Sequence, residues 1–148
     1  MVKKMLKLRL DDEEAETLDG IGISSSFSDY RLAWNLNHAF QWRFEFQENP
    51  LVIPSKKSTE QRTYHYHHFT DEMEKMQLFL IKNKQGGKAL FDEYPQFDFV
   101  LFFKNNLSFD LDQLLPLLRN LDPIFAAYRC KSDDFAVAPF LHFEYAHE

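Results

Sequence analysis

The sequence predicts an α+β protein in which one antiparallel sheet is covered on one face by two helices. Three observations support this fold class. Several segments alternate apolar and polar residues, two segments combine an N-cap with a helical apolar face, and short polar turns join the middle segments. The predicted order is β-α-β-β-β-β-α-β in a single domain spanning residues 1–148. The specific form that we expect is ferredoxin-like with an inserted hairpin.

The first part of the chain predicts a strand followed by a loop. Residues 6–10 alternate leucines with basic side chains, which is typical of a strand with one face in the core and one in water. Residues 11–27 are mostly polar and contain Gly20 and Gly22, so we expect a loop around the short apolar piece between these glycines.

The next segment predicts a helix and then a strand. Ser28 and Asp29 supply an N-cap and a first-turn acid for a helix that runs to about Ala39. Its expected buried face consists of Leu32, Ala33, Leu36 and Phe40. Aromatic residues then alternate with polar ones over 40–46, which predicts a half-buried strand.

The middle of the chain predicts a loop and three further strands. Residues 49–61 contain two prolines and a run of charged and hydroxyl side chains, so we expect a mobile loop there. Strands are expected at about 62–69 and 76–82, with a glycine-rich turn at 84–88. The apolar run 97–103 predicts a central strand that is covered on both faces.

The last part predicts a second helix and a final strand. Asp110 and Gln113 suggest a capping box, although Pro116 then requires either a kink or a later start. A strand is expected over 124–128. The aromatic tail 135–145 is expected to dock, as an edge strand in one interpretation.

Composition and charge exclude several classes of protein. Of 148 residues, 45% are hydrophobic and 16 are Phe, which argues against disorder and predicts a core built from aromatic rings. The formal net charge of −6 argues against nucleic acid as the main partner. The single Cys130 fits a reducing compartment, and basic residues interrupt every apolar run near the N-terminus. We therefore expect a cytoplasmic protein with no membrane partner.

Two histidines form the most provocative motif. On a strand, His65 and His67 point to the same side, and two imidazoles at this spacing can supply two metal ligands. A metal site needs a third ligand, which His142 could supply only if the tail lay nearby. We favour an edge or solvent-facing strand face with Tyr64 and Tyr66 buried behind it, and we expect no metal and no cofactor.

Two carboxylates form the other candidate pair. Glu93 and Asp98 lie five positions apart, which is about 16 Å along an extended chain, so shared acid–base chemistry would need a turn at Pro95. We expect Glu93 in a turn, and Asp98 either faces solvent from a half-buried strand or is a buried carboxylate satisfied by backbone or arginine donors. A structural role for Asp98 is favoured over a site with a buried, unpaired carboxylate. Because the sequence has neither a nucleophile elbow nor a phosphate-binding loop, we expect no catalytic residues, and an enzyme is the less favoured interpretation.

The segment FDEYPQFDF, residues 91–99, resembles the signature of the bacterial IPExxxVDY family. Glu93 and Asp98 match it by identity and spacing, Phe replaces its Ile, Val and Tyr, and Asp92 replaces its Pro. Similar stretches also occur at 6–10, 22–26, 28–37 and 83–84. The resemblance covers most of the chain and implies a shared fold, but it assigns no reaction.

The aromatic content also carries the functional expectation. If Trp34, Trp42 and the tail 135–145 cannot all be buried in one small core, some of these rings form an exposed patch, and such patches mark interfaces. We therefore expect a non-catalytic interaction domain that forms a homo-oligomer or binds another protein. The alternative is a small-ligand or metal-binding protein that uses the His65/His67 face.

Overall fold

The computed structural model describes residues 18–54, 61–73, 75–85, 88–89, 95–104, 106 and 110–130. The main strands are β2 (Leu18–Ser25), β3 (Glu45–Phe46), β6 (Tyr66–Asp71), β7 (Met76–Lys82), β10 (Phe99–Lys104) and β11 (Ile124–Cys130). The helices are α2 (Asp29–Phe40) and α3 (Leu111–Arg119). Two smaller hairpins pair β4 (Leu51–Pro54) with β5 (Gln61–Tyr64), and β8 (Lys84–Gln85) with β9 (Lys88–Ala89).

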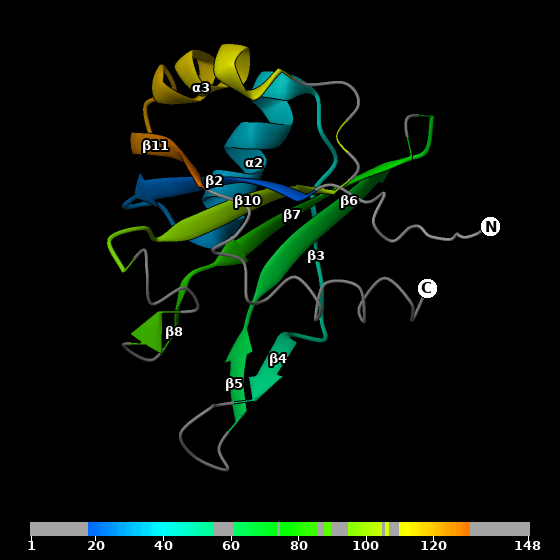
Figure 1. Cartoon of the computed structure of the whole chain (residues 1–148), viewed down its shortest axis with the longest axis vertical. Helices are drawn as coiled ribbons and strands as arrows, with labels where there is room; N and C mark the ends of the chain where they lie inside the picture. Colours follow the sequence, from blue (N-terminus) through cyan, green and yellow to red (C-terminus); the bar gives the residue numbers. More distant parts are fainter. Residues whose placement is uncertain are drawn as a thin grey trace, which may run out of the picture.

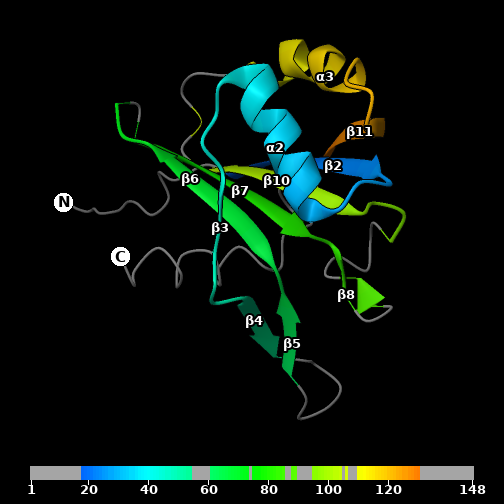
Figure 2. The same cartoon turned by 180° about the vertical axis from the view of Figure 1, so that it is seen from behind.

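The six main strands form one sheet, in the order β11-β2-β10-β7-β6-β3, and each neighbouring pair is antiparallel. Both helices lie over the same face of this sheet (Figures 1 and 2). The predicted fold class is therefore confirmed. The strand expected at 6–10 and the tail 135–145 lie outside the described residues. No helix within the described ranges is long and apolar enough to cross a bilayer.

Four strands and the two helices have the connectivity of the expected ferredoxin-like arrangement. β2 and β7 both pair antiparallel with β10, so they run parallel to one another with β10 between them. β10 and β11 likewise run parallel with β2 between them. Each half is thus a split βαβ unit. β3 and β6 extend the sheet beyond β7, and the β8–β9 hairpin is inserted between β7 and β10.

The main core lies between the sheet and the two helices. It combines the alternate, helix-facing residues of the strands with the apolar faces of α2 and α3. Its fully buried members include Ile21, Ile23, Leu32, Leu36, Leu78, Leu101, Phe103 and Leu118. All six residues of β10 are buried, which confirms the prediction that this strand is covered on both faces.

Helix α2 begins where the sequence predicts. Ser28 is its N-cap and accepts a hydrogen bond from the Arg31 backbone N–H, while Asp29 lies in the first turn. The predicted apolar face is buried, and Phe40 packs against it. The helix ends at Gln41, whose φ of 60° is left-handed.

The strand predicted over 40–46 is wrong in extent, because only Glu45–Phe46 pairs with a neighbouring strand. Phe40 belongs to the helix, whereas Trp42 and Phe44 are buried without being part of a ladder. The Asn37 side chain takes the place of a strand partner. Its Oδ1 accepts from the Phe44 N–H at 2.8 Å, and its Nδ2 donates to the Phe44 carbonyl at 3.2 Å. The alternation therefore reflects burial of aromatic rings rather than sheet pairing.

The loop predicted over 11–27 is wrong for residues 18–25, because Leu18–Ser25 forms a strand between β10 and β11, whereas residues 11–17 lie outside the described ranges. Gly22 suggested a loop, yet its lack of a side chain serves a close approach. A Cβ at this position would overlap the ring of Phe97, which lies against the strand. Glycine inside a strand often marks such an approach of another group to the backbone.

The segment 49–61, expected to be a mobile loop, contains β4 and the start of β5, with residues 55–60 outside the description. The strand predicted at 62–69 is present but is interrupted at His65, where β5 ends and β6 follows. The turn at 84–88 is confirmed as a hairpin, and β7 and β11 lie where strands were predicted.

Helix α3 begins at the predicted cap. The Asp110 carboxylate accepts from the Asp112 N–H at 3.0 Å, and Gln113 donates its backbone N–H to the Asp110 carbonyl. Pro116 lies inside the helix and neither delays its start nor ends it. Because proline has no N–H, it cannot make the intrahelical bond of that position.

Candidate functional site

The structure places His65 and His67 at the side of the sheet where β3 pairs with β6. His67 of β6 contacts Tyr30 of α2, so its ring lies on the helix side of the sheet, and His65, the residue between β5 and β6, packs against the same Phe46 ring as His67. The ring centroid of Phe46 is 5.8 Å from that of His65 and 5.4 Å from that of His67. Tyr30 of α2 packs against Phe46 at 5.1 Å and meets His67 edge-on at 5.4 Å. We call Tyr30, Phe46, His65 and His67 the histidine–aromatic cluster.

The prediction of an edge or solvent-facing histidine face is wrong for His67, which is buried and belongs to a strand that pairs with both β3 and β7. Tyr64 and Tyr66 are buried as well, so the strand is covered on both faces. Burial lowers the pKa of His67 below its ordinary value, and the nearby Asp29 carboxylate counteracts this effect only in part. The imidazole of His67 is therefore neutral at physiological pH. The Nδ1 atoms of His65 and His67 are both buried without a hydrogen-bond partner.

A neutral imidazole is the form that binds transition metals, so this cluster has part of the required chemistry. Across the described ranges, however, no three His, Cys, Asp or Glu side chains are grouped to hold a metal ion. His142, the third ligand considered from the sequence, lies outside them. The Phe46 ring packs against both imidazoles.

Asp98 lies at a junction of three chain segments that are distant in sequence. Its Oδ2 accepts from the Ser25 backbone N–H at 2.9 Å, and its Oδ1 is 3.4 Å from the Lys84 Nζ. Its backbone N–H donates to the Ile23 carbonyl at 2.9 Å. The carboxylate thus binds the last residue of β2 and an ammonium that follows β7. This geometry is that of a structural carboxylate, whereas its proposed acid–base partner, Glu93, lies outside the described residues.

Asn83 also belongs to this junction, through its side chain and its backbone N–H. It is fully buried, its Nδ2 donates to the Phe97 carbonyl at 2.8 Å, and its backbone N–H donates to the Asp98 carbonyl at 2.9 Å. The Ser24 hydroxyl donates to the Gln96 carbonyl at 3.2 Å. We call Ser24, Ser25, Asn83, Lys84 and residues 96–98 the signature junction. It fixes how the segment before β10 crosses the ends of β2 and β7.

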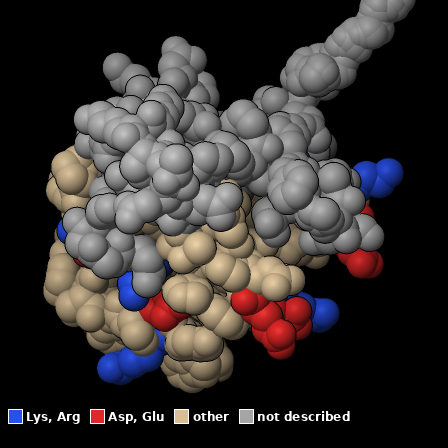
Figure 3. Space-filling model, turned by 90° about the horizontal axis from the view of Figure 1, so that it is seen from below, with Lys and Arg blue, Asp and Glu red and all other residues tan. Residues whose placement is uncertain are grey.

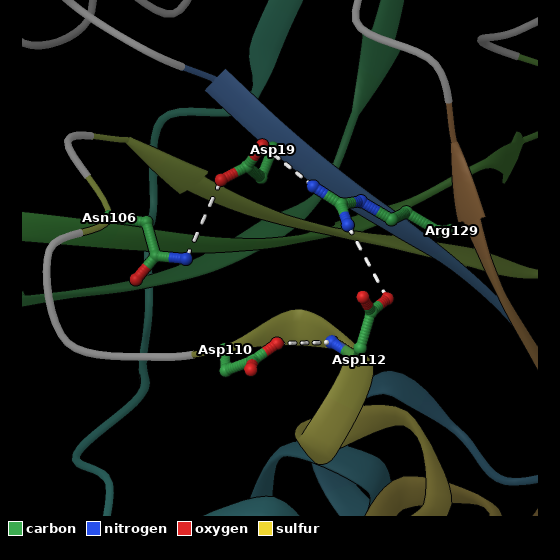
Figure 4. Close-up of polar contacts among 5 residues, drawn as sticks. All are labelled: Asp19, Asn106, Asp110, Asp112 and Arg129. Carbon is green, nitrogen blue, oxygen red and sulfur yellow. Dashed lines mark hydrogen bonds and ion pairs between the residues drawn. The ribbon is translucent and has the colours of Figure 1, made fainter.

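A second polar group joins elements near the start of α3 (Figure 4). The Arg129 guanidinium of β11 lies 3.8 Å from an Asp19 oxygen of β2 and 3.5 Å from an Asp112 oxygen of α3. The Asn106 side chain donates to the other Asp19 oxygen at 3.5 Å. Because Asp112 and Arg129 are largely exposed, these are surface ion pairs of small energetic value. Sequence reasoning missed this group, since nothing local pairs these three elements.

Among the described residues, the exposed large hydrophobic side chains include four aromatic rings, two on α2 and two on β11, besides Val52, Met73 and Leu117. Tyr30 and Trp34 of α2 are 58% and 59% exposed, and Phe125 and Tyr128 of β11 are 72% and 56% exposed. Trp42, in contrast, is buried among other aromatic rings. The expectation that some rings remain exposed therefore holds for one of the two tryptophans.

Charged side chains are dispersed over the described surface visible in Figure 3, where Lys and Arg form separate small groups and no continuous basic stripe. Comparison with protein-family models, with curated proteins and with solved structures gives no match for this chain.

Proposed function

We propose that the protein is a non-catalytic interaction domain that associates with a second copy of itself. The observation that carries this proposal is that α2 and β11 each have two large exposed aromatic rings. Single exposed apolar residues are normal on protein surfaces, but Tyr30 and Trp34 lie four residues apart on one helix and so are neighbours, and contiguous aromatic surface of this kind is typical of interfaces.

The free energy gained by burying these rings is large enough to support an interface. Fully burying a large apolar side chain contributes roughly 1.5–3 kcal/mol. Phe125 and Tyr128 are more than half exposed, so a symmetric contact that covers both rings on each copy would gain several kcal/mol before the cost of association. The proposal assigns no catalytic residue, no cofactor and no nucleic-acid partner, and it places the protein in the cytoplasm.

Light scattering of the full chain over micromolar concentrations tests this proposal. We expect the mass of a dimer or a larger assembly, with dissociation on dilution. A monomer mass over the whole concentration range would overturn self-association.

A second candidate function is small-ligand or metal binding at the histidine–aromatic cluster, and the unpartnered Nδ1 atoms of His65 and His67 favour it. Melting with equimolar Zn²⁺ separates the two functions. We expect almost no change in Tm, because an incomplete site barely favours the native state over the unfolded chain. A saturable rise in Tm that is lost in the His65→Ala/His67→Ala variant would establish the second function.

We also propose that the chain is related to the IPExxxVDY family. The support comes from the signature junction, in which several separate stretches that carry the resemblance meet. Residues 22–26, Asn83, Lys84 and Asp98 contact one another or the segment between them through hydrogen bonds and an ion pair. Related proteins would keep such stretches because the same contacts hold the same fold, so the similarity does not require a shared reaction.

A further inference from the structure

The outer face of α2 carries a continuous row of rings. Tyr30, Trp34 and His38 follow one another at intervals of four residues, so they lie along one side of the helix. The ring centroids of Trp34 and His38 are stacked 3.8 Å apart, and Tyr30 packs against the half-buried Phe46 of β3 at 5.1 Å. In Figure 2, α2 lies in front of the sheet, with α3 above it. We call Tyr30, Trp34 and His38 the α2 ring row.

The α2 ring row has the composition of an interface centre. All three of its side chains are exposed, and the one Lys, Arg, Asp or Glu among the exposed positions of α2 is Arg31. The Arg31 guanidinium lies over the Phe27 ring, 4.2 Å from its centroid. Interface centres are depleted of most charged residues, whereas aromatic residues and arginine are enriched there. Because the chain has a formal net charge of −6, two copies repel one another least where exposed acidic side chains are absent.

α2 is the better suited of the two elements that carry exposed aromatic rings. On β11, Phe125 lies where the register with β2 shifts, so the regular spacing of a strand does not bring it beside Tyr128. The Tyr128 ring already packs against the Phe97 ring at 6.2 Å and beneath the Arg119 guanidinium at 5.5 Å. The rings of α2 are instead consecutive members of one row.

We infer that the α2 ring row packs against the same row of a second copy, with the two helices antiparallel and the two-fold axis beside Trp34. This inference rests on the proposed self-association and names its surface. Around a two-fold axis the same patch of both copies meets, so the patch must complement itself. Trp34 is the middle member of the row, and an axis beside it therefore covers Tyr30 and His38 of both copies as well.

The polar atoms at the two ends of the row select the antiparallel direction. His38 Nδ1 lies 2.9 Å from the Trp34 carbonyl, which can only accept, so Nδ1 carries the hydrogen and Nε2 of the neutral ring is an acceptor. The Tyr30 hydroxyl is a donor. An antiparallel pair places Tyr30 of each copy level with His38 of the other, whereas a parallel pair would place like residues together. Within one copy these two residues are roughly 12 Å apart along the helix axis, too far to bond past Trp34.

The area available predicts a weak dimer. An aromatic side chain buries roughly 150–250 Å², and Tyr30 and Trp34 are slightly more than half exposed, so the four rings of a pair would bury roughly 400–500 Å². Standard interfaces begin at roughly 1,200 Å², and smaller ones are typical of transient association. We therefore expect a dimer that dissociates on dilution.

Fluorine NMR of the full chain tests this surface. The chain has two tryptophans, the exposed Trp34 and the buried Trp42, so labelling with fluorotryptophan gives two signals, which a Trp34→Phe chain assigns. Light scattering of the same samples gives the fraction of dimer. As the concentration rises through the dimer transition, we expect the Trp34 signal to move and to lose at least about half of its shift between H₂O and D₂O. The Trp42 signal should stay constant.

Substitutions locate the contact independently. Trp34→Lys should weaken dimerisation at least about tenfold, since tryptophan at the centre of an interface typically dominates binding. Leu117→Lys is the matched control, because Leu117 is an apolar residue of α3 that is also more than half exposed, and it should leave the dimer unchanged. Phe125→Lys, which removes an exposed ring of β11, should leave it unchanged as well.

The direction of the helices has its own test. Tyr30→Phe and His38→Phe should each weaken dimerisation at least about threefold, and the double variant should be no weaker than either single variant, because both remove the same hydrogen bond. Additive losses would overturn the antiparallel pairing. A wild-type dimer in which Trp34 keeps its full solvent shift, or a dimer weakened by Phe125→Lys and not by Trp34→Lys, would overturn the α2 inference alone. A wild-type monomer would overturn the proposed function as well.

Discussion

Replacing Gly22 by alanine should destabilise the protein because the added methyl group would overlap the ring of Phe97. The ring is buried and lies against β2 at the signature junction, so it has little room to move. Overpacking of this kind typically costs about 1–3 kcal/mol. Reduced freedom of the unfolded chain returns about 0.4–1 kcal/mol, since alanine is stiffer than glycine. We therefore expect a net loss of about 1–2 kcal/mol.

A double-mutant cycle identifies the cause of this loss. Phe97→Ala alone should cost about 3–5 kcal/mol, because it removes a buried ring. In the Gly22→Ala/Phe97→Ala protein the clash is absent and the new methyl group fills part of the cavity. The double variant should therefore be no less stable than Phe97→Ala, which gives a coupling energy of about 1–3 kcal/mol.

Urea unfolding measures all four proteins, with an unchanged m-value as the condition for comparing midpoints. The control cycle combines Gly22→Ala with Phe79→Ala, since Phe79 is equally buried but lies on β7, two strands away from β2. That cycle should be additive. Additivity of Gly22 and Phe97 within about 0.5 kcal/mol, or a stabilising Gly22→Ala, would refute the close approach.

Three further predictions concern single polar groups. Asn37→Ala should cost about 1–3 kcal/mol in urea unfolding by leaving both backbone groups of Phe44 without a partner, whereas Asn37→Asp should cost less because it keeps the acceptor. Burial lowers the pKa of His67, so the unfolded chain binds the imidazole proton more readily than the folded chain, and the free energy of unfolding should fall as pH drops below about 6.5. His67→Gln should flatten this part of the curve of Tm against pH. An unchanged slope would show that His67 is not the group responsible. Asp98→Ala should lower the free energy of unfolding by about 1–2 kcal/mol, because the Ser25 N–H loses its acceptor, whereas Asp98→Asn should lower it by under about 1 kcal/mol. Loss of self-association without loss of stability would instead make Asp98 a binding residue.

Elements with strong local signals were predictable from the sequence. Ser28 and Asp110 mark both helix starts, and the apolar run after Phe97 marks the central strand. β2 was missed because Gly22 resembles a loop residue until the position of the Phe97 ring is known. The position of that ring depends on tertiary structure, and no residue pattern near Gly22 indicates it.

For the candidate site residues, the sequence likewise predicts the side to which a side chain points but not what surrounds it. Period-two geometry places His65 and His67 on one side, but it cannot say that Tyr30 of a helix covers that side. The role of Asn37 could not be predicted, because its partner Phe44 is reached only after the chain has turned at the end of α2. Contacts between distant segments, ring packing for the histidines and hydrogen bonds for Asn37, determine the surroundings of these side chains.

The position of β2 has a consequence for how the chain folds. Both strands that pair with β2 come from late in the sequence, and the Ser25–Asp98 hydrogen bond that closes the junction joins residues 73 positions apart. On a ribosome, β2 and α2 therefore emerge long before any strand that can flank β2. Because such distant contacts must overcome the entropy of closing a long loop, folding should be slow for a chain of this size. Until β10 is synthesised, the apolar side chains of β2 and α2 remain exposed to misassociation.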